Sequence, residues 1–184
     1  ALARSLDASY SAVQLTLSLY LVTVAISQLV IGPLSDGFGR RPCVLFSITL
    51  FVAGSLLGVV APDLAVLLMA RILQAAGAGT AFALARAIIR DTATRDETAS
   101  QIGYVTMVMV TVPMVSPLIG AWLDSHAGWR AIFAAMALMG FVSLMFSLWR
   151  LSETAPFTGP PGSIASTFRA IPVLIRDAGL KAAG

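Results

Sequence analysis

Five long apolar stretches, separated by short polar segments, restrict this chain to a small set of folds. The hydrocarbon core of a bilayer, about 30 Å thick, is crossed by roughly 20 helical residues, because each residue advances a helix by about 1.5 Å. Lipid offers no hydrogen bonds, so a chain that crosses it must satisfy its backbone groups internally, as a helix does. We therefore predict transmembrane helices over residues 11–31, 44–60, 64–89, 102–123 and 131–149, with connections at 32–42, 61–63, 90–101 and 124–130.

The composition supports a lipid environment. Hydrophobic residues make up 58% of the 184 residues and charged residues only 11%, whereas soluble domains carry about 25% charged residues. The mean hydropathy is +0.87. A chain with so few polar residues cannot cover a water-exposed surface, so the expected fold class is an all-α membrane protein.

The formal net charge of +3 does not indicate a nucleic-acid partner. The arginines lie at the ends of the apolar stretches rather than in a basic stripe interleaved with aromatic residues. Cys43 is the single cysteine, and it has no cysteine or histidine at metal-ligand spacing. We expect Cys43 to be a packing residue, and we predict neither a metal site nor a cofactor.

The arginines also predict the orientation of the chain, because positively charged segments are retained in the cytoplasm. One set of span ends carries Arg40, Arg41, Arg86, Arg90, Arg95 and Arg150. The opposite set carries only Arg4 and Arg130. We therefore expect the N-terminus in the periplasm and residues 151–184 in the cytoplasm.

Proline and glycine in the tail, residues 151–184, predict a linker, and apolar residues at helical spacing indicate an amphipathic helix at the membrane surface.

Arg71 lies inside the third apolar stretch, in LLMARILQAAGAG. A cation within a membrane span costs several kcal/mol unless it faces a bundle interior or a wet cavity, so such an arginine usually serves a function. The alternative is that Arg71 extends toward the outer interface and only anchors the helix. Gln74 follows on the same helix face. It can act in the same cavity as a donor and acceptor, or it can hold two helices together.

Small residues at four-residue spacing predict close helix packing. The second stretch has Gly54 and Gly58, and the third has Ala75, Gly79, Ala83 and Ala87.

In the fourth stretch, VTVPMVSPLIGAW contains Pro113 and Pro117, followed by Gly120. Each proline removes a helical hydrogen bond and crowds the preceding turn, so we expect this span to be bent. The bend is either static or a hinge.

The polar segment GPLSDGFGRRP lies between the first two apolar stretches. A short connection between antiparallel spans needs backbone angles that glycine permits, so we expect Gly37 and Gly39 to reverse the chain. Asp36 can neutralise Arg40 or lie at the N-terminus of another helix, where the dipole is positive. The segment is thus a cytoplasmic charge latch or a positively charged turn, in which Arg40 and Arg41 also set orientation.

This polar segment resembles the loop signature of the major facilitator superfamily, G-x-L-x-D-x-x-G-R-[RK]. The matching residues are Gly32, Leu34, Asp36, Gly39, Arg40 and Arg41. LLMARILQAAGAG is similar to the fourth-span motif of that superfamily, at Arg71, Gln74 and Gly77.

VTVPMVSPLIGAW resembles the fifth-span signature of proton-driven antiporters, G-x-x-x-G-P-x-x-G-G. Pro117 and Gly120 match, while Val112, Ser116 and Ala121 stand where glycine is usual. Taken along its whole length, the chain is most similar to the bicyclomycin and chloramphenicol resistance branch of drug:proton antiporters.

The resemblance implies a partial N-terminal bundle in the bacterial inner membrane. It covers the second to sixth spans of a twelve-span protein, without the first span and the C-terminal half. By the same resemblance, Asp36 would cap a helix of the missing half in the outward-open state, and Arg40 would pair with Asp36 and Asp91. The resemblance also implies that Arg71 couples proton movement to substrate through a carboxylate of the first span. No Asp or Glu lies deep in the predicted spans, so the titrating group is not expected within them.

The expected function is secondary active transport: export of drug-like small molecules in exchange for protons by alternating access. The expected partners are the substrate, protons, the bilayer and the missing parts of the transporter. An enzyme is not expected, because the sequence shows no nucleophile with a positioned base and no nucleotide loop such as GxxxxGK[ST]. Two alternatives stay open: a transporter of one specific metabolite, and a truncated membrane protein that does not transport.

Overall fold

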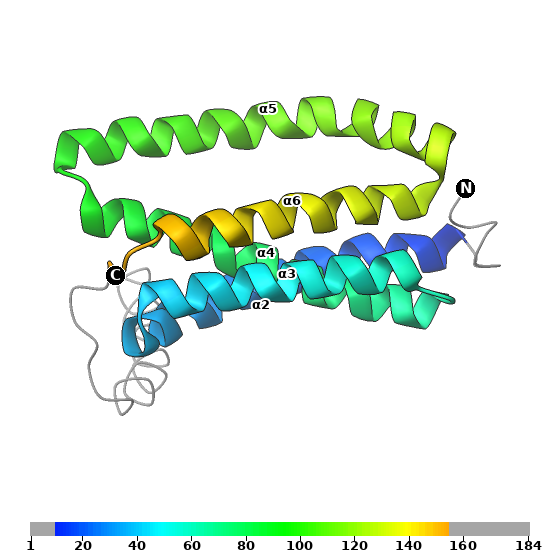
Figure 1. Ribbon diagram of the computed structural model, residues 1–184, viewed down its shortest axis with the longest axis horizontal. Coiled ribbons are helices and arrows are strands. Elements are labelled where there is room, and N and C mark those ends of the chain that lie inside the picture. The colour runs from blue at the N-terminus through cyan, green and yellow to red at the C-terminus, as the bar shows by residue number, and fades with distance from the viewer. Residues whose placement is uncertain (1–9, 155–184) are drawn as a thin grey trace, which may run out of the picture.

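The computed structural model describes residues 10–154. Within them, five helices run back and forth along the long axis of the molecule (Figure 1). In chain order they are α2 (Tyr10–Phe38), α3 (Arg40–Val60), α4 (Leu64–Thr92), α5 (Arg95–Ala127) and α6 (Trp129–Arg150). Each is long and apolar enough to cross a membrane, and the described residues contain no strand. The predicted fold class is confirmed, while the amphipathic helix predicted within the tail lies outside the described residues.

The connections between helices alternate between the two ends of the bundle. Gly39 and residues 93–94 lie at one end, which we call the Gly39 end. Residues 61–63 and Gly128 lie at the other, which we call the Gly128 end. The predicted turn at 61–63 is confirmed, and Asp63 begins α4 by accepting a hydrogen bond from the backbone N–H of Val66 at 2.9 Å.

The other predicted connections are too long. The segments 90–101 and 124–130 are mostly helical, because α5 begins at Arg95 and continues to Ala127. The physical reason at the start of α5 is a capping box: the side chains of Thr94 and Glu97 bond the first free N–H groups. Polar residues at a membrane surface can therefore begin a helix well before the apolar stretch starts.

The polar segment between α2 and α3 is also almost entirely helical. α2 continues through Pro33 to Phe38 and α3 starts at Arg40, so Gly39 alone separates them. Gly39 has a φ of 94°, in the region that favours glycine. The expectation that Gly37 also reverses the chain is wrong, because one residue of positive φ is enough to redirect the chain from α2 into α3.

α3 and α4 approach closely where glycine leaves room for a neighbouring backbone. A Cβ atom on Gly54 would lie 2.6 Å from the backbone nitrogen of Gln74, and one on Gly77 would lie 2.5 Å from the carbonyl oxygen of Ser47. Gly79 approaches α2 in the same way. The structure therefore shows the close packing that the small-residue spacing predicts.

α6 completes the packed core, whereas α5 lies at its edge. Phe133 of α6 packs against Gly58 and belongs to a buried cluster at the Gly128 end with Ala61, Leu67 and Trp129. In Figure 1, α5 runs along one edge of the bundle, with α6 between it and α3. None of the residues in the most apolar window of α5 is buried by the described chain. Most of the α5 surface is therefore left open by the other four helices.

Candidate functional site

Gln74 connects three helices within the membrane-spanning part of the molecule. Its side chain is 1% exposed. Its Nε2 atom donates a hydrogen bond to Ser55 Oγ of α3 at 2.8 Å and lies 3.6 Å from Met136 Sδ of α6. Its Oε1 atom accepts a hydrogen bond from Arg71 Nη1 at 3.4 Å. Gln74 thus both joins the helices and contacts Arg71, so the two interpretations of this residue are not exclusive.

Arg71 points into the bundle, two helical turns from the start of α4. The central carbon of its guanidinium group lies 4.9 Å from the ring centre of Phe133 and 5.9 Å from that of Tyr20. Cation–π contacts of this kind contribute about 0.5–2 kcal/mol each. Among the described residues, no carboxylate lies within ion-pair distance of Arg71. Arg71 therefore lies in the interior of the bundle, rather than extending to the outer interface where it would only anchor the helix.

A cavity of about 370 Å³ lies beside Arg71. Four helices line it, through Thr16, Leu67, Arg71, Gly120, Ala121, Asp124, Trp129, Ile132 and Phe133. The structure thus brings Gly120 of the predicted bend to the Arg71 site. It does not bring Pro113 or Pro117 there: both lie on exposed positions of α5, which continues through them as one helix.

The charged residues at the Gly39 end form a compact cluster around Arg40. Arg40 Nη2 lies 2.8 Å from Asp36 Oδ1 of α2, and Arg40 Nε lies 3.0 Å from Asp91 Oδ2 of α4. A further hydrogen bond joins Arg40 to Ser35 Oγ. The side-chain exposures are 11% for Arg40, 16% for Asp91 and 60% for Asp36. We call Asp36, Arg40 and Asp91 the charge latch.

The two ion pairs of the charge latch differ in strength. Exposed ion pairs contribute about 0–1 kcal/mol, because water and ions screen them. A charged hydrogen bond shielded from water contributes about 1.5–3 kcal/mol. We therefore expect the shielded pair of Arg40 with Asp91 to hold the cluster, and the exposed Asp36 carboxylate to be free to exchange partners.

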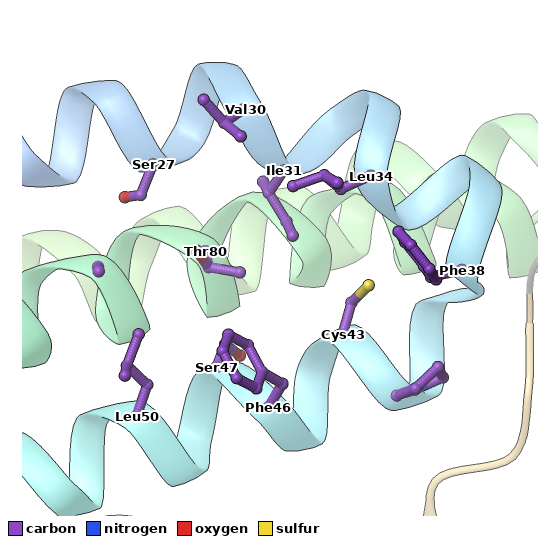
Figure 2. Close-up of a pocket in the computed structure, with 12 residues that line it drawn as sticks. Ser27, Val30, Ile31, Leu34, Phe38, Cys43, Phe46, Ser47, Leu50 and Thr80 are labelled. Carbon is purple, nitrogen blue, oxygen red and sulfur yellow. The ribbon is translucent and has the colours of Figure 1, made fainter. Parts of the chain in front are cut away.

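A second cavity, of about 550 Å³ and almost wholly apolar, lies between α2 and α3 and is also lined by α4. Figure 2 shows Val30, Leu34 and Phe38 of α2 facing Cys43 and Phe46 of α3 across it. Phe38 lies between Asp36 and Arg40 in the sequence, so this cavity adjoins the charge latch. Cys43 is half-buried and packs against a core cluster, as predicted for a packing residue.

The sequence pattern of the Major Facilitator Superfamily matches residues 1–181. The chain belongs to the major facilitator superfamily. The predicted resemblance is therefore confirmed at the level of the family, and with it the assignment as a multi-pass membrane protein.

Three members of the superfamily show how far the similarity extends. An MFS-type transporter of Bacillus subtilis, YdgK, is 36% identical over 179 residues, which are 96% of this chain and 44% of that protein. Multidrug resistance protein D of Escherichia coli is 32% identical over 92% of this chain and 43% of its own length. A chloramphenicol resistance protein of Pseudomonas aeruginosa is 40% identical over 79% of this chain and 35% of its own length. The chain thus spans less than half the length of these relatives.

One residue of this major facilitator chain was missed by the sequence analysis. Glu153, just after α6, accepts hydrogen bonds from the backbone N–H groups of Arg40 at 2.8 Å and Arg41 at 3.2 Å. These N–H groups lie at the N-terminus of α3, where a negative charge interacts favourably with the helix dipole. A Cβ atom on Gly39 would lie 2.7 Å from Glu153 Oε2. The φ of 94° is what requires glycine at this junction, while Glu153 holds the backbone that carries Arg40.

Replacing Glu153 with alanine should loosen the junction between α2 and α3. Removal of a helix cap costs about 0.5–2 kcal/mol, and the exposed position of Glu153 favours the lower half of that range. The checks are thermal unfolding of the complete protein in detergent and the rate of tryptic cleavage after Arg40, since Arg41 is followed by Pro42 and is not a tryptic site. Ser152→Ala, at the exposed neighbouring position, is the matched control. Equal cleavage rates and equal Tm values in the two variants would contradict the capping role.

Proposed function

We propose that the complete protein is a secondary transporter that exports drug-like small molecules in exchange for protons by alternating access. The names of its relatives from Escherichia coli and Pseudomonas aeruginosa support drugs as substrates. The chain would supply part of the N-terminal bundle, with a first span and a C-terminal half supplied by the rest of the protein. The Gly39 end would face the cytoplasm of a bacterium, and the N-terminus the periplasm, since most arginines lie at the Gly39 end.

The position of Arg71 is the observation that carries this proposal. A positive charge inside a membrane protein is retained where it acts on ions or substrates. Arg71 faces a cavity rather than lipid, and Gln74 keeps its guanidinium oriented from one side. We assign proton coupling or substrate contact to Arg71 and Gln74.

The charge latch suits a conformational role at the cytoplasmic surface. It joins α2, α3 and α4 through a single arginine. A two-state contact needs one shielded ion pair that stays formed and one exposed carboxylate that can change partner. The charge latch has both. We propose that Asp36 contacts a helix N-terminus of the C-terminal half in one state and only Arg40 in the other.

Replacing Asp91 with asparagine in the complete transporter should slow transport by roughly fivefold to tenfold, with little change in the substrate concentration needed for half-maximal rate. The reason is that Arg40 loses its shielded partner, while both cavities keep their linings. Asp63→Asn is the matched control, because asparagine caps a helix as well as aspartate does. An unchanged maximal rate in Asp91→Asn would show that the latch does not limit the cycle.

The apolar cavity supports amphipathic substrates in preference to one strongly polar metabolite. Its wall offers large contact area and few hydrogen-bonding groups, namely the hydroxyls of Ser27, Ser47 and Thr80. Such a surface binds by apolar contact and discriminates weakly between molecules of similar size.

The deciding experiment uses the complete protein reconstituted into liposomes with an imposed pH gradient. Ethidium and chloramphenicol movement should require the gradient and should stop when a protonophore removes it. Metabolite candidates are added as competitors: inhibition by one metabolite together with failure to move either drug would favour the specific-metabolite alternative. If no candidate moves under any gradient, the protein is not a transporter of these classes and the proposal fails.

A further inference from the structure

Asp124 presents a buried carboxylate oxygen that the functions assigned above leave unexplained. It lies within one turn of the end of α5 and lines the cavity beside Arg71. Its Oδ1 atom is buried and has no hydrogen-bond partner among the described residues. A buried polar atom without a partner costs about 1–3 kcal/mol, and more when it carries charge. Such an atom is stabilised when it gains a partner from outside the described residues, such as water or a proton.

The cavity is lined by two charged residues, Asp124 and Arg71. Among the described residues that line it, Asp124 is the one acidic residue and Arg71 the one basic residue. Arg71 comes from α4 and has one hydrogen bond to the described residues, the long one to Gln74. The two charged groups lie more than 4.0 Å apart, since they form no ion pair.

The other titratable or charged groups near the Gly128 end are engaged elsewhere. Arg130 of α6 donates to the carbonyl oxygen of Ala61 at 2.8 Å and stacks on Trp129. His126 of α5 is exposed and bonds to its own helix at the carbonyl oxygen of Trp122. Asp63 is bonded to the N-terminus of α4, and Tyr20 of α2 lies against Arg71. None of them lines the cavity.

We infer that Asp124 is a proton-binding residue of the Arg71 cavity. The step transfers a proton from a hydronium ion in the cavity to a carboxylate oxygen: one O–H bond of hydronium breaks, one O–H bond forms on Asp124, and water and a neutral carboxyl group result. The reverse step returns the proton to water. When Asp124 is ionised, it balances Arg71 across the cavity; when it is protonated, Arg71 is left without a counter-charge and is free to favour another arrangement or an anionic or polar group of the substrate.

This inference rests on the proposed function and adds the residue that the sequence analysis assigned to an absent span. The carboxylate lies near the end of α5, outside the apolar stretch, so hydropathy does not mark it as an intramembrane acid. The fold nevertheless brings it to the wall of the cavity that holds Arg71, because α5 and α6 turn at Gly128 next to the start of α4. Proton exchange at this site would occur from the Gly128 end.

The test compares the complete transporter with its variants Asp124→Asn, Asp124→Glu and His126→Asn in liposomes, with ethidium as the probe. Two rates are measured: ethidium movement driven by a pH gradient, and ethidium exchange at equal pH on both sides. In Asp124→Asn, the rate of ethidium movement driven by the pH gradient should fall roughly tenfold or more. The rate of exchange at equal pH should be kept and should no longer depend on pH. Asp124→Glu should keep driven transport. His126→Asn, which changes an exposed titratable group two residues away, should behave as the wild type.

Each alternative gives a different result. Driven transport that persists in Asp124→Asn would overturn the inference. Loss of both rates in both Asp124 variants, together with a lower Tm, would show a structural role and would also overturn it. A wild-type protein that exchanges ethidium but ignores the pH gradient would instead contradict proton coupling in the proposed function. In that case Asp124→Asn would show the same pH dependence of exchange as the wild type.

Discussion

Replacing Arg71 with alanine in the complete transporter is expected to reduce pH-gradient-driven drug transport by about 100-fold. The substitution removes the cation of the interior cavity and also its contacts with Gln74, Phe133 and Tyr20. Lysine should restore only a small part of the activity, because an ammonium group cannot stack on Phe133 while directing several donors toward the cavity. The measurement is the initial rate of ethidium transport in liposomes containing equal amounts of folded protein.

The same helix offers a matched control for Arg71. Arg86 also lies on α4 and stacks on an aromatic ring, with its guanidinium carbon 4.4 Å from the ring centre of Phe82, but it is exposed. Arg86→Ala should leave the transport rate nearly unchanged. If Arg71→Ala transports as fast as Arg86→Ala at equal expression, Arg71 serves helix assembly and its assignment to coupling fails.

Replacing Gly54 with alanine should destabilise the fold, unlike a methyl addition where the described bundle leaves open space. The added Cβ atom would lie 2.6 Å from the backbone nitrogen of Gln74 and 2.8 Å from the carbonyl oxygen of Ala70. Both are backbone atoms of α4, so the clash cannot be relieved by a side-chain rotation and α3 must move away. Forcing extra volume into a packed core costs about 1–3 kcal/mol or more. The separation would also stretch the hydrogen bond from Gln74 to Ser55.

The Tm in detergent, followed by intrinsic fluorescence and by size-exclusion profile after heating, measures this effect. Gly77→Ala should behave in the same way, since its Cβ atom would lie 2.6 Å from the backbone nitrogen of Phe51. Gly103→Ala is the control: α5 leaves open space there, and alanine favours a helix over glycine by about 1 kcal/mol. Equal Tm values for Gly54→Ala and Gly103→Ala would refute the close approach of α3 and α4.

Some candidate residues of the site can be singled out because their cost is visible in the sequence. Arg71 stands out since a cation among apolar residues is unfavourable wherever it points, and Gln74 follows at helical spacing on the same face. Gly54 and Gly79 stand out because small residues at four-residue spacing let helices approach. Each of these signals is local to one helix, so it can be interpreted without knowing the neighbours.

Connection lengths were predicted poorly for a related reason. Hydropathy marks where a helix enters lipid, but a helix ends where its backbone hydrogen bonding stops. At Thr94 and Glu97 the capping box begins α5 before the apolar stretch, and at Gly39 a single residue separates two helices. The polar residues of these segments are therefore the ends of helices rather than loops.

The apolar stretches and their motifs determine the number of described helices, the family and the interior position of Arg71, because the cost of placing polar groups in lipid acts on each helix separately. The partners of the charged groups depend instead on how the helices pack. Glu153 meets the backbone of Arg40 across 113 positions of sequence, and Asp124 shares a cavity with Arg71 although the two residues lie on different helices. No spacing rule relates such residues, since their distance is set by the turns at Gly39 and Gly128 and by the glycines that bring α3, α4 and α6 together.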